Sequence, residues 1–196
     1  MADAAPWLLV GLGNPGSAYA GHRHNVGFMI VEHWVERHGG TNTGGWRDKF
    51  NARVANVATP WGRVVALLPQ TYMNRSGSSV GPAAGFFHVP PAQIVVVHDE
   101  IDFELSRVAI KKAGGHGGHN GLRDLIVGLG TAEFARIRVG VGRPTRGDVA
   151  DWVLSDFSAT ERATALPGMI ARSDDMITAI FRDGLAAAMN TNNAKP

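Results

Sequence analysis

The 196-residue sequence contains no cysteine. This absence excludes disulfides, thiolate nucleophiles and cysteine-based zinc or iron–sulfur sites, so any chemistry must come from His, Asp, Glu, Ser, Asn and backbone amides. Long apolar runs are also missing, because stretches such as residues 64–68 and 94–97 are far shorter than the roughly 20 residues that span a bilayer. The N-terminus lacks the basic and long apolar segments of a signal peptide. We therefore expect a cytoplasmic protein without membrane contact.

Charged residues are sparse and nearly balanced. They make up 18% of the chain and give a net charge of +2. The basic residues between Arg107 and Arg146 are clustered in the sequence and could face phosphates, but the overall balance is too mild to indicate nucleic-acid binding by itself. With 44% hydrophobic residues, the chain is long enough to bury a substantial core, and we expect a single domain over residues 1–196.

Short apolar or β-branched segments bounded by Gly, Pro or Asn predict six strands. These segments are residues 7–10, 54–57, 64–68, 94–97, 108–111 and 137–141. A turn at residues 59–62 joins the second and third segments into a hairpin, so the sheet is expected to be mixed and not purely parallel.

Helical spacing of apolar residues predicts helices over residues 26–38, 122–129 and 158–181. Ser158 and Glu161 have the spacing of a capping box, and Pro167-Gly168 should kink or split the last helix. Together the elements predict an α/β fold with three layers, α/β/α, around a twisted, mixed and mostly parallel sheet. Residues 41–45 and 190–196 are expected to be flexible.

Two short motifs match other protein classes. Residues 11–16 have the G-x-G-x-x-G spacing of dinucleotide-binding loops, but the next predicted helix begins too late for that fold. Ser79 lies in a G-x-S-x-G pattern, with Asp99 and His119 following in the order of an α/β-hydrolase triad. The polar residues 71–76 do not predict the strand that such a serine requires, so we interpret the serines at positions 76, 78 and 79 as helix caps. A Ser79 esterase remains an alternative.

Histidines and acidic residues at positions 22–24, 98–102 and 116–119 offer metal-binding donors. None of these clusters has the i, i+4 spacing of a zinc-protease helix or the spacing of an EF-hand loop. We therefore expect no metal and no other cofactor.

Amide and imidazole side chains gather in loops, at residues 13–16, 21–25, 71–74 and 115–121, and His98-Asp99-Glu100 ends a buried strand. In an open α/β sheet, the loops at the carboxyl ends of strands meet in one crevice, so Asn14 and Asp99 should lie close together. A histidine held by a buried aspartate among asparagine amides suits activation of water and stabilisation of an oxyanion, without a metal or covalent intermediate.

Several of these segments, in order along residues 7–185, resemble the bacterial-type peptidyl-tRNA hydrolases. The motifs are GLGNPG at 11–16, RHNxG at 23–27, PQTYMNRSG at 69–77, HDEID at 98–102, GGHGGHNGL at 114–122 and RIRVGVGRP at 136–144. The resemblance implies an enzyme that cleaves the ester between a peptide and the terminal ribose of tRNA. It also implies a monomer that works without a cofactor and binds the acceptor stem and CCA end of peptidyl-tRNA.

The resemblance assigns a role to each matching residue. His24 becomes the general base that deprotonates water, and Asp99 fixes its tautomer and stabilises the imidazolium. Asn14 and Asn120 orient the water and the terminal nucleotide. Met73 and Asn74 are implied to contact the peptide and the ester carbonyl, and His119 and Tyr19 to contact the substrate. Lys111 and Arg138 are implied to contact tRNA phosphates. Three further candidates for phosphate contacts rest on charge alone: Lys112, Arg136 and Arg143. A non-catalytic RNA-binding protein of the same fold is the second alternative.

Overall fold

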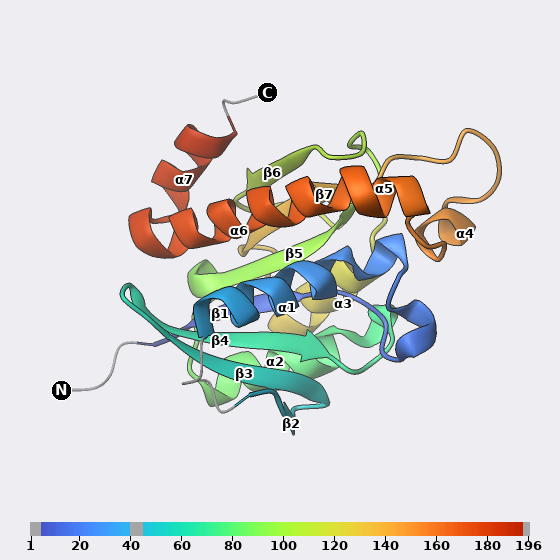
Figure 1. Cartoon of the computed structure of the whole chain (residues 1–196). Coiled ribbons are helices and arrows are strands. Elements are labelled where there is room, and N and C mark those ends of the chain that lie inside the picture. Colours follow the sequence, from blue (N-terminus) through green and yellow to red (C-terminus); the bar gives the residue numbers. More distant parts are fainter. Residues whose placement is uncertain (1–4, 40–44, 194–196) are drawn as a thin grey trace.

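A computed structural model describes residues 5–39 and 45–193, and its centre is a seven-stranded sheet. The strand order is β2-β3-β4-β1-β5-β7-β6 (Figure 1). The strands are β1 (Trp7–Gly11), β2 (Arg47–Lys49), β3 (Ala52–Thr59), β4 (Gly62–Pro69), β5 (Ile94–Glu100), β6 (Val108–Lys111) and β7 (Ala135–Gly140). The four central strands pair in parallel, and β2, β3 and β6 join through antiparallel pairs. The sheet is mixed, as predicted.

Helices cover both faces of this sheet. One face packs against α1 (Val26–Gly39) and α6 (Leu166–Asp183), and the other packs against α2 (Gly77–Phe86) and α3 (Asn120–Leu129). Alternation along β1 explains the two cores, because Leu9 faces the first pair of helices while Leu8 and Val10 face the second. The three-layer α/β/α arrangement is thereby confirmed.

The remaining helices are short. They are α4 (Val149–Val153), α5 (Ala159–Thr164), α7 (Leu185–Asn192) and the 3-10 turns η1 (Ser17–Tyr19), η2 (Arg23–Asn25), η4 (Met73–Arg75) and η5 (Pro91–Gln93). The predicted long helix is split as expected, since α5 ends at Thr164 and α6 starts with Pro167 in its first turn, where a missing N–H costs nothing. The Ser158–Glu161 capping box is also present.

The prediction that serines cap α2 is wrong. Ser76 has helical backbone angles because η4 runs directly into α2, so its hydroxyl donates back to the Met73 carbonyl instead of accepting from the helix. The hydroxyl of Ser78 donates to the Arg75 carbonyl in the same way. The first N–H of α2, at Gly77, instead donates to the Asp124 carboxylate from α3 at 2.7 Å.

The end of the chain is more ordered than the sequence indicates. Residues 190–192 belong to α7, and the Asn193 carboxamide exchanges two hydrogen bonds with the backbone of Ile110 on the edge strand β6, at 2.9 and 2.7 Å. The rest of the expected flexible tail, residues 194–196, and residues 41–44 of the expected flexible loop lie outside the described residues. Within the described ranges, no helix combines the length and apolar character needed to cross a membrane.

Candidate active site

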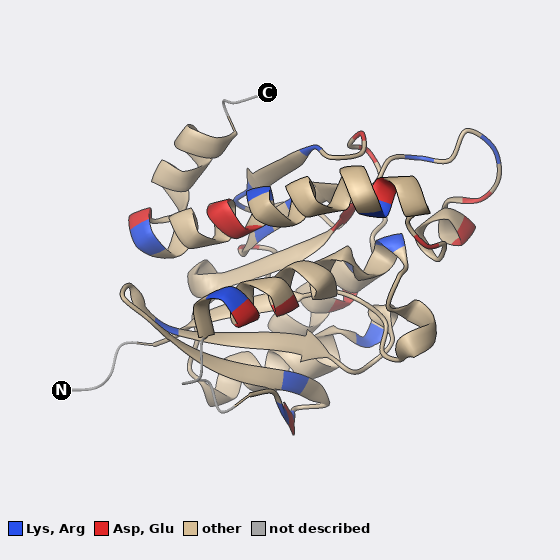
Figure 2. Ribbon diagram, in the orientation of Figure 1, with Lys and Arg blue, Asp and Glu red and all other residues tan. Residues whose placement is uncertain are grey.

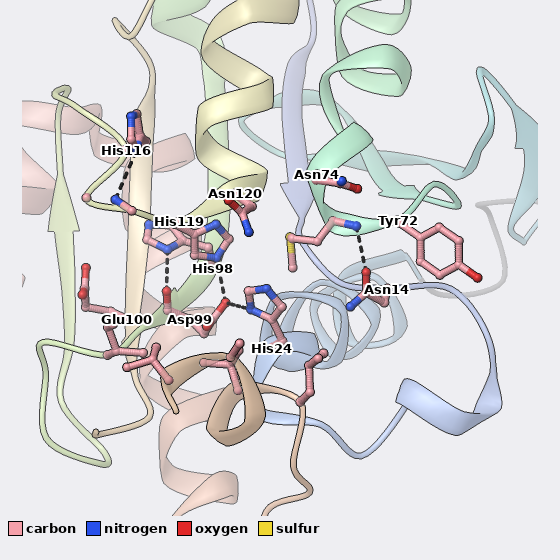
Figure 3. Close-up of a pocket in the computed structure, with 18 residues that line it drawn as sticks. Asn14, His24, Tyr72, Asn74, His98, Asp99, Glu100, His116, His119 and Asn120 are labelled. Carbon is pink, nitrogen blue, oxygen red and sulfur yellow. Dashed lines mark hydrogen bonds and ion pairs between the residues drawn. The ribbon is translucent and has the colours of Figure 1, made fainter. Parts of the chain in front are cut away.

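Loops at the carboxyl ends of the parallel strands surround a cavity of about 480 Å³ (Figure 3). This volume is in the range of small-molecule and cofactor pockets. Most of the predicted catalytic and substrate-binding residues line it: Asn14, His24, Met73, Asn74, Asp99, His119 and Asn120. The expectation that Asn14 and Asp99 share one crevice is confirmed.

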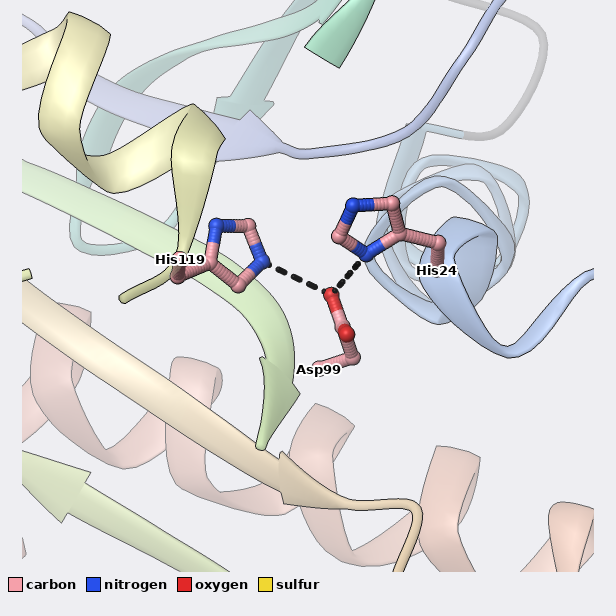
Figure 4. Close-up of side chains that lie close together, drawn as sticks. All are labelled: His24, Asp99 and His119. Carbon is pink, nitrogen blue, oxygen red and sulfur yellow. Dashed lines mark hydrogen bonds and ion pairs between the residues drawn. The ribbon is translucent and has the colours of Figure 1, made fainter. Parts of the chain in front are cut away.

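Asp99 lies at the end of β5 and joins two histidines (Figure 4). Its Oδ1 is 2.8 Å from His24 Nδ1 and 2.8 Å from His119 Nε2, and the residue is only 3% exposed. The other ring nitrogen of His119, Nδ1, accepts a hydrogen bond from the Leu122 N–H, so the ring proton of His119 is on Nε2. His24 donates through Nδ1, which leaves its Nε2 as a base.

The charge of Asp99 controls the protonation of His24. Burial by itself lowers the pKa of His24, but the attraction and hydrogen bond of Asp99 outweigh burial and raise this pKa above 6.5. Burial alone would raise the pKa of Asp99, whereas the charges and hydrogen bonds of His24 and His119 outweigh it and hold that pKa well below its usual range. Asp99 therefore stays ionised and stabilises protonated His24.

Asn14 is fixed in place on both its backbone and its side chain. Its N–H and C=O are hydrogen bonded to the side chain of Asn25 at 3.0 and 2.9 Å. Its Oδ1 accepts from the Met73 N–H at 2.7 Å. The amide nitrogen of Asn14 is thus left as a donor, and Figure 3 shows it on the side facing His24.

Asn120 is oriented in a similar way at the start of α3. Its Oδ1 accepts from the Arg123 guanidinium at 2.8 Å, which leaves the amide nitrogen free to donate. Asn74 projects from η4, and both Asn74 and Asn120 line the cavity. The site therefore presents amide donors around a histidine base, an arrangement that can hold a water and polarise a carbonyl.

The segment carrying His24 is anchored by Arg23, which is 4% exposed. The Arg23 guanidinium lies 3.9 Å from the centre of the Trp152 ring, donates to Ser155 Oγ at 2.9 Å and pairs with Glu161 at 2.7 Å. These contacts fix η2 against the chain around α4, which supplies one wall of the cavity. The sequence carries no signal for this contact, because more than a hundred residues separate its partners.

Comparison with known proteins identifies the family of this chain. The family described as Peptidyl-tRNA hydrolase matches residues 8–196. The chain belongs to the peptidyl-tRNA hydrolase family. A peptidyl-tRNA hydrolase from Sorangium cellulosum is 45% identical, over 96% of this chain and 84% of the relative, and one from Mycolicibacterium smegmatis is 45% identical over 97% and 99%. The crystal structure of peptidyl-tRNA hydrolase from Acinetobacter baumannii is 36% identical and covers 99% of this chain and 97% of that one, with a TM-score of 0.86.

Two neighbouring tyrosines, Tyr19 and Tyr72, differ in whether they line the cavity. Tyr19 was predicted to bind substrate, but it is not among the cavity-lining residues. Its ring instead packs edge-on against Tyr72, with ring centres 6.3 Å apart, and Tyr72 lines the cavity and is 59% exposed. Tyr72 lies beside Met73 and Asn74 in segment 69–77, one of the segments that carry the resemblance, and this position is the signal that could have identified it.

The predicted phosphate-binding residues differ in the acidic partners that they have. Figure 2 marks the positions of Lys and Arg in blue and of Asp and Glu in red along the ribbon. Among the described residues, no ion pair joins Lys111 or Lys112 to an acidic residue, whereas Arg138 donates through Nε to Glu100 at 2.9 Å. Arg143 is exposed but pairs with Asp102. The charge-based prediction for Arg136 is wrong, because this side chain is buried beneath the loop before α3 and cannot reach a phosphate.

A metal ion is the alternative use of the His24, Asp99 and His119 donors, which lie within 4.8 Å of one another. Two imidazoles and a carboxylate are a common transition-metal set. A metal on His119 Nε2 would move the ring proton to Nδ1, where it would face the Leu122 N–H. The donor set therefore fits shared protons better than a metal.

The serine alternative fails on geometry. Ser79 is fully buried inside α2, and its hydroxyl donates to the Asn51 carbonyl at 2.9 Å. It does not line the cavity that holds Asp99 and His119. Ser79 is therefore a structural residue of this peptidyl-tRNA hydrolase family member and not a nucleophile.

Proposed function

We propose that this chain hydrolyses the ester between the peptide and the terminal ribose of peptidyl-tRNA, using a water molecule that His24 deprotonates. The observation that carries the proposal is the His24–Asp99 hydrogen bond at 2.8 Å inside a cavity lined with amide donors. Family membership supplies the substrate.

His24 Nε2 takes a proton from water while the water oxygen attacks the ester carbonyl. Asp99 stabilises the imidazolium that forms, and the amide nitrogens of Asn14 and Asn120 are placed to donate to the water and the developing oxyanion. When the tetrahedral intermediate collapses, His24 returns the proton to the leaving ribose oxygen. The products are free tRNA and peptide, and no covalent enzyme intermediate or cofactor is needed.

Substrate recognition divides between the cavity and the surface beside it. Asn74 and Met73 are proposed to hold the peptide amide, which distinguishes a blocked amino acid from one with a free ammonium group. His119 and Tyr72, with Tyr19 behind it, form the surrounding wall. Lys111, Lys112 and the free Nη groups of Arg138 are proposed to contact acceptor-stem phosphates.

The test uses N-acetyl-aminoacyl-tRNA and unblocked aminoacyl-tRNA as substrates, with EDTA present. We expect the purified chain to cleave only the blocked substrate, and His24→Ala to lower turnover on the order of 10²–10⁴-fold. His33→Ala, on α1 and outside the cavity, is the matched control and should retain activity. Near-normal turnover by His24→Ala would remove His24 as the base, and tRNA binding without cleavage by the wild type would favour the RNA-binding alternative.

We also propose that the enzyme acts as a cytoplasmic monomer without a metal. The hydrogen-bonded protons of His24 and His119 support metal independence, which the EDTA condition tests. Sedimentation equilibrium tests the monomer, since a mass near twice 20.8 kDa would contradict it.

A further inference from the structure

The loop that brings His119 and Asn120 into the cavity consists largely of glycine. Gly114, Gly117 and Gly118 have φ angles of 130°, 55° and 84°, in the region that disfavours residues with side chains. Within the loop, Gly118 N–H donates to His116 Nδ1 and the His119 N–H donates to the His116 carbonyl. These bonds shape the loop locally but do not fix it to the sheet.

Arg136 supplies a fixed point beneath this loop. It projects from β7 toward the layer that contains α3 and is only 1% exposed. Its Nη1 donates to the Gly115 carbonyl at 2.6 Å, and its Nη2 donates to the Gly114 carbonyl. The planar guanidinium thus holds two consecutive carbonyls, which a single ammonium group cannot do with the same geometry.

We propose that Arg136 is a positioning residue for the hydrolytic site, an inference that rests on the proposed function. Arg136 fixes Gly114 and Gly115, and the short turn that follows delivers His119 Nε2 to Asp99 Oδ1. His119 in turn shares the negative charge of the oxygen that also holds His24. Arg136 therefore acts on the catalytic base, His24, through His119 and Asp99, and it does not itself contact the substrate.

Loss of this anchor has a defined effect on pH dependence. If the loop moves, Asp99 Oδ1 loses the His119 hydrogen bond and its full charge acts on His24. The pKa of His24 then rises, so the pH at which activity appears moves upward. A defect in overall folding would lower activity at every pH without moving the inflection.

Arg136→Lys is the first test, because it keeps the charge but not the forked geometry. We expect kcat to fall about 10²-fold, as for small displacements of catalytic groups, with the pH inflection shifted upward. The affinity for tRNA that carries no amino acid or peptide should not change. Arg182→Lys, an exposed arginine at the end of α6, is the matched control and should behave as wild type.

Arg136→Gln separates positioning from phosphate binding. This variant removes the charge while its amide can still donate to one carbonyl, so we expect a kcat loss with an unchanged salt dependence of tRNA binding. If the plot of log affinity against log salt concentration becomes less steep by about 0.9, the variant has lost a phosphate contact, and the proposal is overturned.

The His119 Nε2 proton gives a readout that does not depend on turnover. In NMR spectra of the folded wild type, this proton should be protected from exchange by its bond to Asp99, and Arg136→Lys should lose the protection. Unchanged protection together with unchanged kcat would refute the positioning role. Failure of the wild type to cleave blocked substrate would instead contradict the proposed function, while the NMR comparison still tests the anchor.

Discussion

At the scale of single residues, the two histidines on Asp99 differ because their remaining nitrogens differ. His119 Nδ1 is occupied by the Leu122 N–H, whereas His24 Nε2 is left as a base in the cavity. One carboxylate oxygen thus binds a fixed donor, His119, and the proposed base, His24, at the same 2.8 Å distance. This difference in their partners is the reason that the proposed function gives the catalytic proton to His24 and not to His119.

The pH dependence of kcat/KM should report the raised pKa of His24. Activity requires neutral His24, so it should increase with pH and show an inflection above 6.5. Asp99→Asn removes the attraction while burial remains, so the inflection should move to lower pH and kcat should fall on the order of 10²–10⁴-fold. A pH-rate series on both proteins measures this. An inflection that stays in place in Asp99→Asn would show that another group controls the profile.

Asn14→Asp tests the donor role of the Asn14 amide nitrogen. The carboxylate can still accept from the Met73 N–H, so the fold should be retained. The cavity-facing donor is replaced by an acceptor, and kcat should fall about 10²–10³-fold, as when an oxyanion-hole donor is lost. Steady-state kinetics together with thermal unfolding provide the measurement. Wild-type kcat in a folded variant would contradict the assigned orientation.

Loop positions at the strand ends were enough to predict that Asn14 and Asp99 meet, and the resemblance to the family added His24 to this pair. The sequence could not show which ring nitrogens carry protons, since that depends on the Leu122 N–H and the position of the loop before α3. It also could not show that Arg136 is buried, because charge is read from composition while burial depends on tertiary packing.

At the scale of elements, close backbone contact brings the His24 segment to the ends of the strands. A Cβ on Gly27, in the first turn of α1, would lie 2.4 Å from the Val97 carbonyl oxygen and 2.6 Å from the Leu12 nitrogen. Both neighbours are backbone atoms, in the middle of β5 and just after the end of β1, and they cannot easily move. Glycine at this position therefore sets how closely His24 approaches Asp99.

Gly27→Ala should destabilise the protein by about 1–3 kcal/mol, as overpacked cores do, and it should also lower kcat. Urea unfolding and steady-state kinetics measure the two effects. The matched control is Gly85→Ala in α2, where a Cβ meets nothing within 4 Å, and alanine there should stabilise by about 0.5–1 kcal/mol. Equal stability of the two variants would refute the close-contact argument.

Elements with a strong apolar period or capping signal were predictable, including all six expected strands and the Ser158 capping box. The three-residue β2 strand is fully exposed, and α4 has only five residues, so neither carries enough periodic pattern to be recognised. The cap of α2 was missed because it comes from Asp124 on another helix and not from the chain just before it.

At the scale of the whole molecule, buried titratable groups at the site link stability to pH with opposite signs. The raised pKa of His24 stabilises the fold below 6.5, and that contribution is lost as pH rises through the folded value. The lowered pKa of Asp99 stabilises the fold above 3.8, and that contribution is lost on acidification below this value. A third group, His98, acts in the range between them.

His98 is fully buried, and its Nδ1 donates to the Asp99 carbonyl at 2.7 Å. Burial, together with the nearby His119 and Arg136, outweighs the attraction of Asp99 and lowers the pKa of His98 to about 3. Between this value and 6.5, the unfolded chain binds a proton at His98 that the folded protein does not. Acidification through this range should therefore favour unfolding.

His98→Asn should remove this contribution, because the amide can keep the bond to the Asp99 carbonyl without binding a proton. Between pH 6 and 4, each pH unit of acidification should lower the free energy of unfolding of the wild type by up to about 1.4 kcal/mol more than that of His98→Asn. His24 and Asp99 are present in both proteins, so their contributions cancel in the difference. Urea unfolding at several pH values measures it, with His88→Asn, at an exposed histidine, as the matched control that should parallel wild type. Parallel curves for wild type and His98→Asn would mean that His98 binds its proton equally in both states, contrary to its burial in the site.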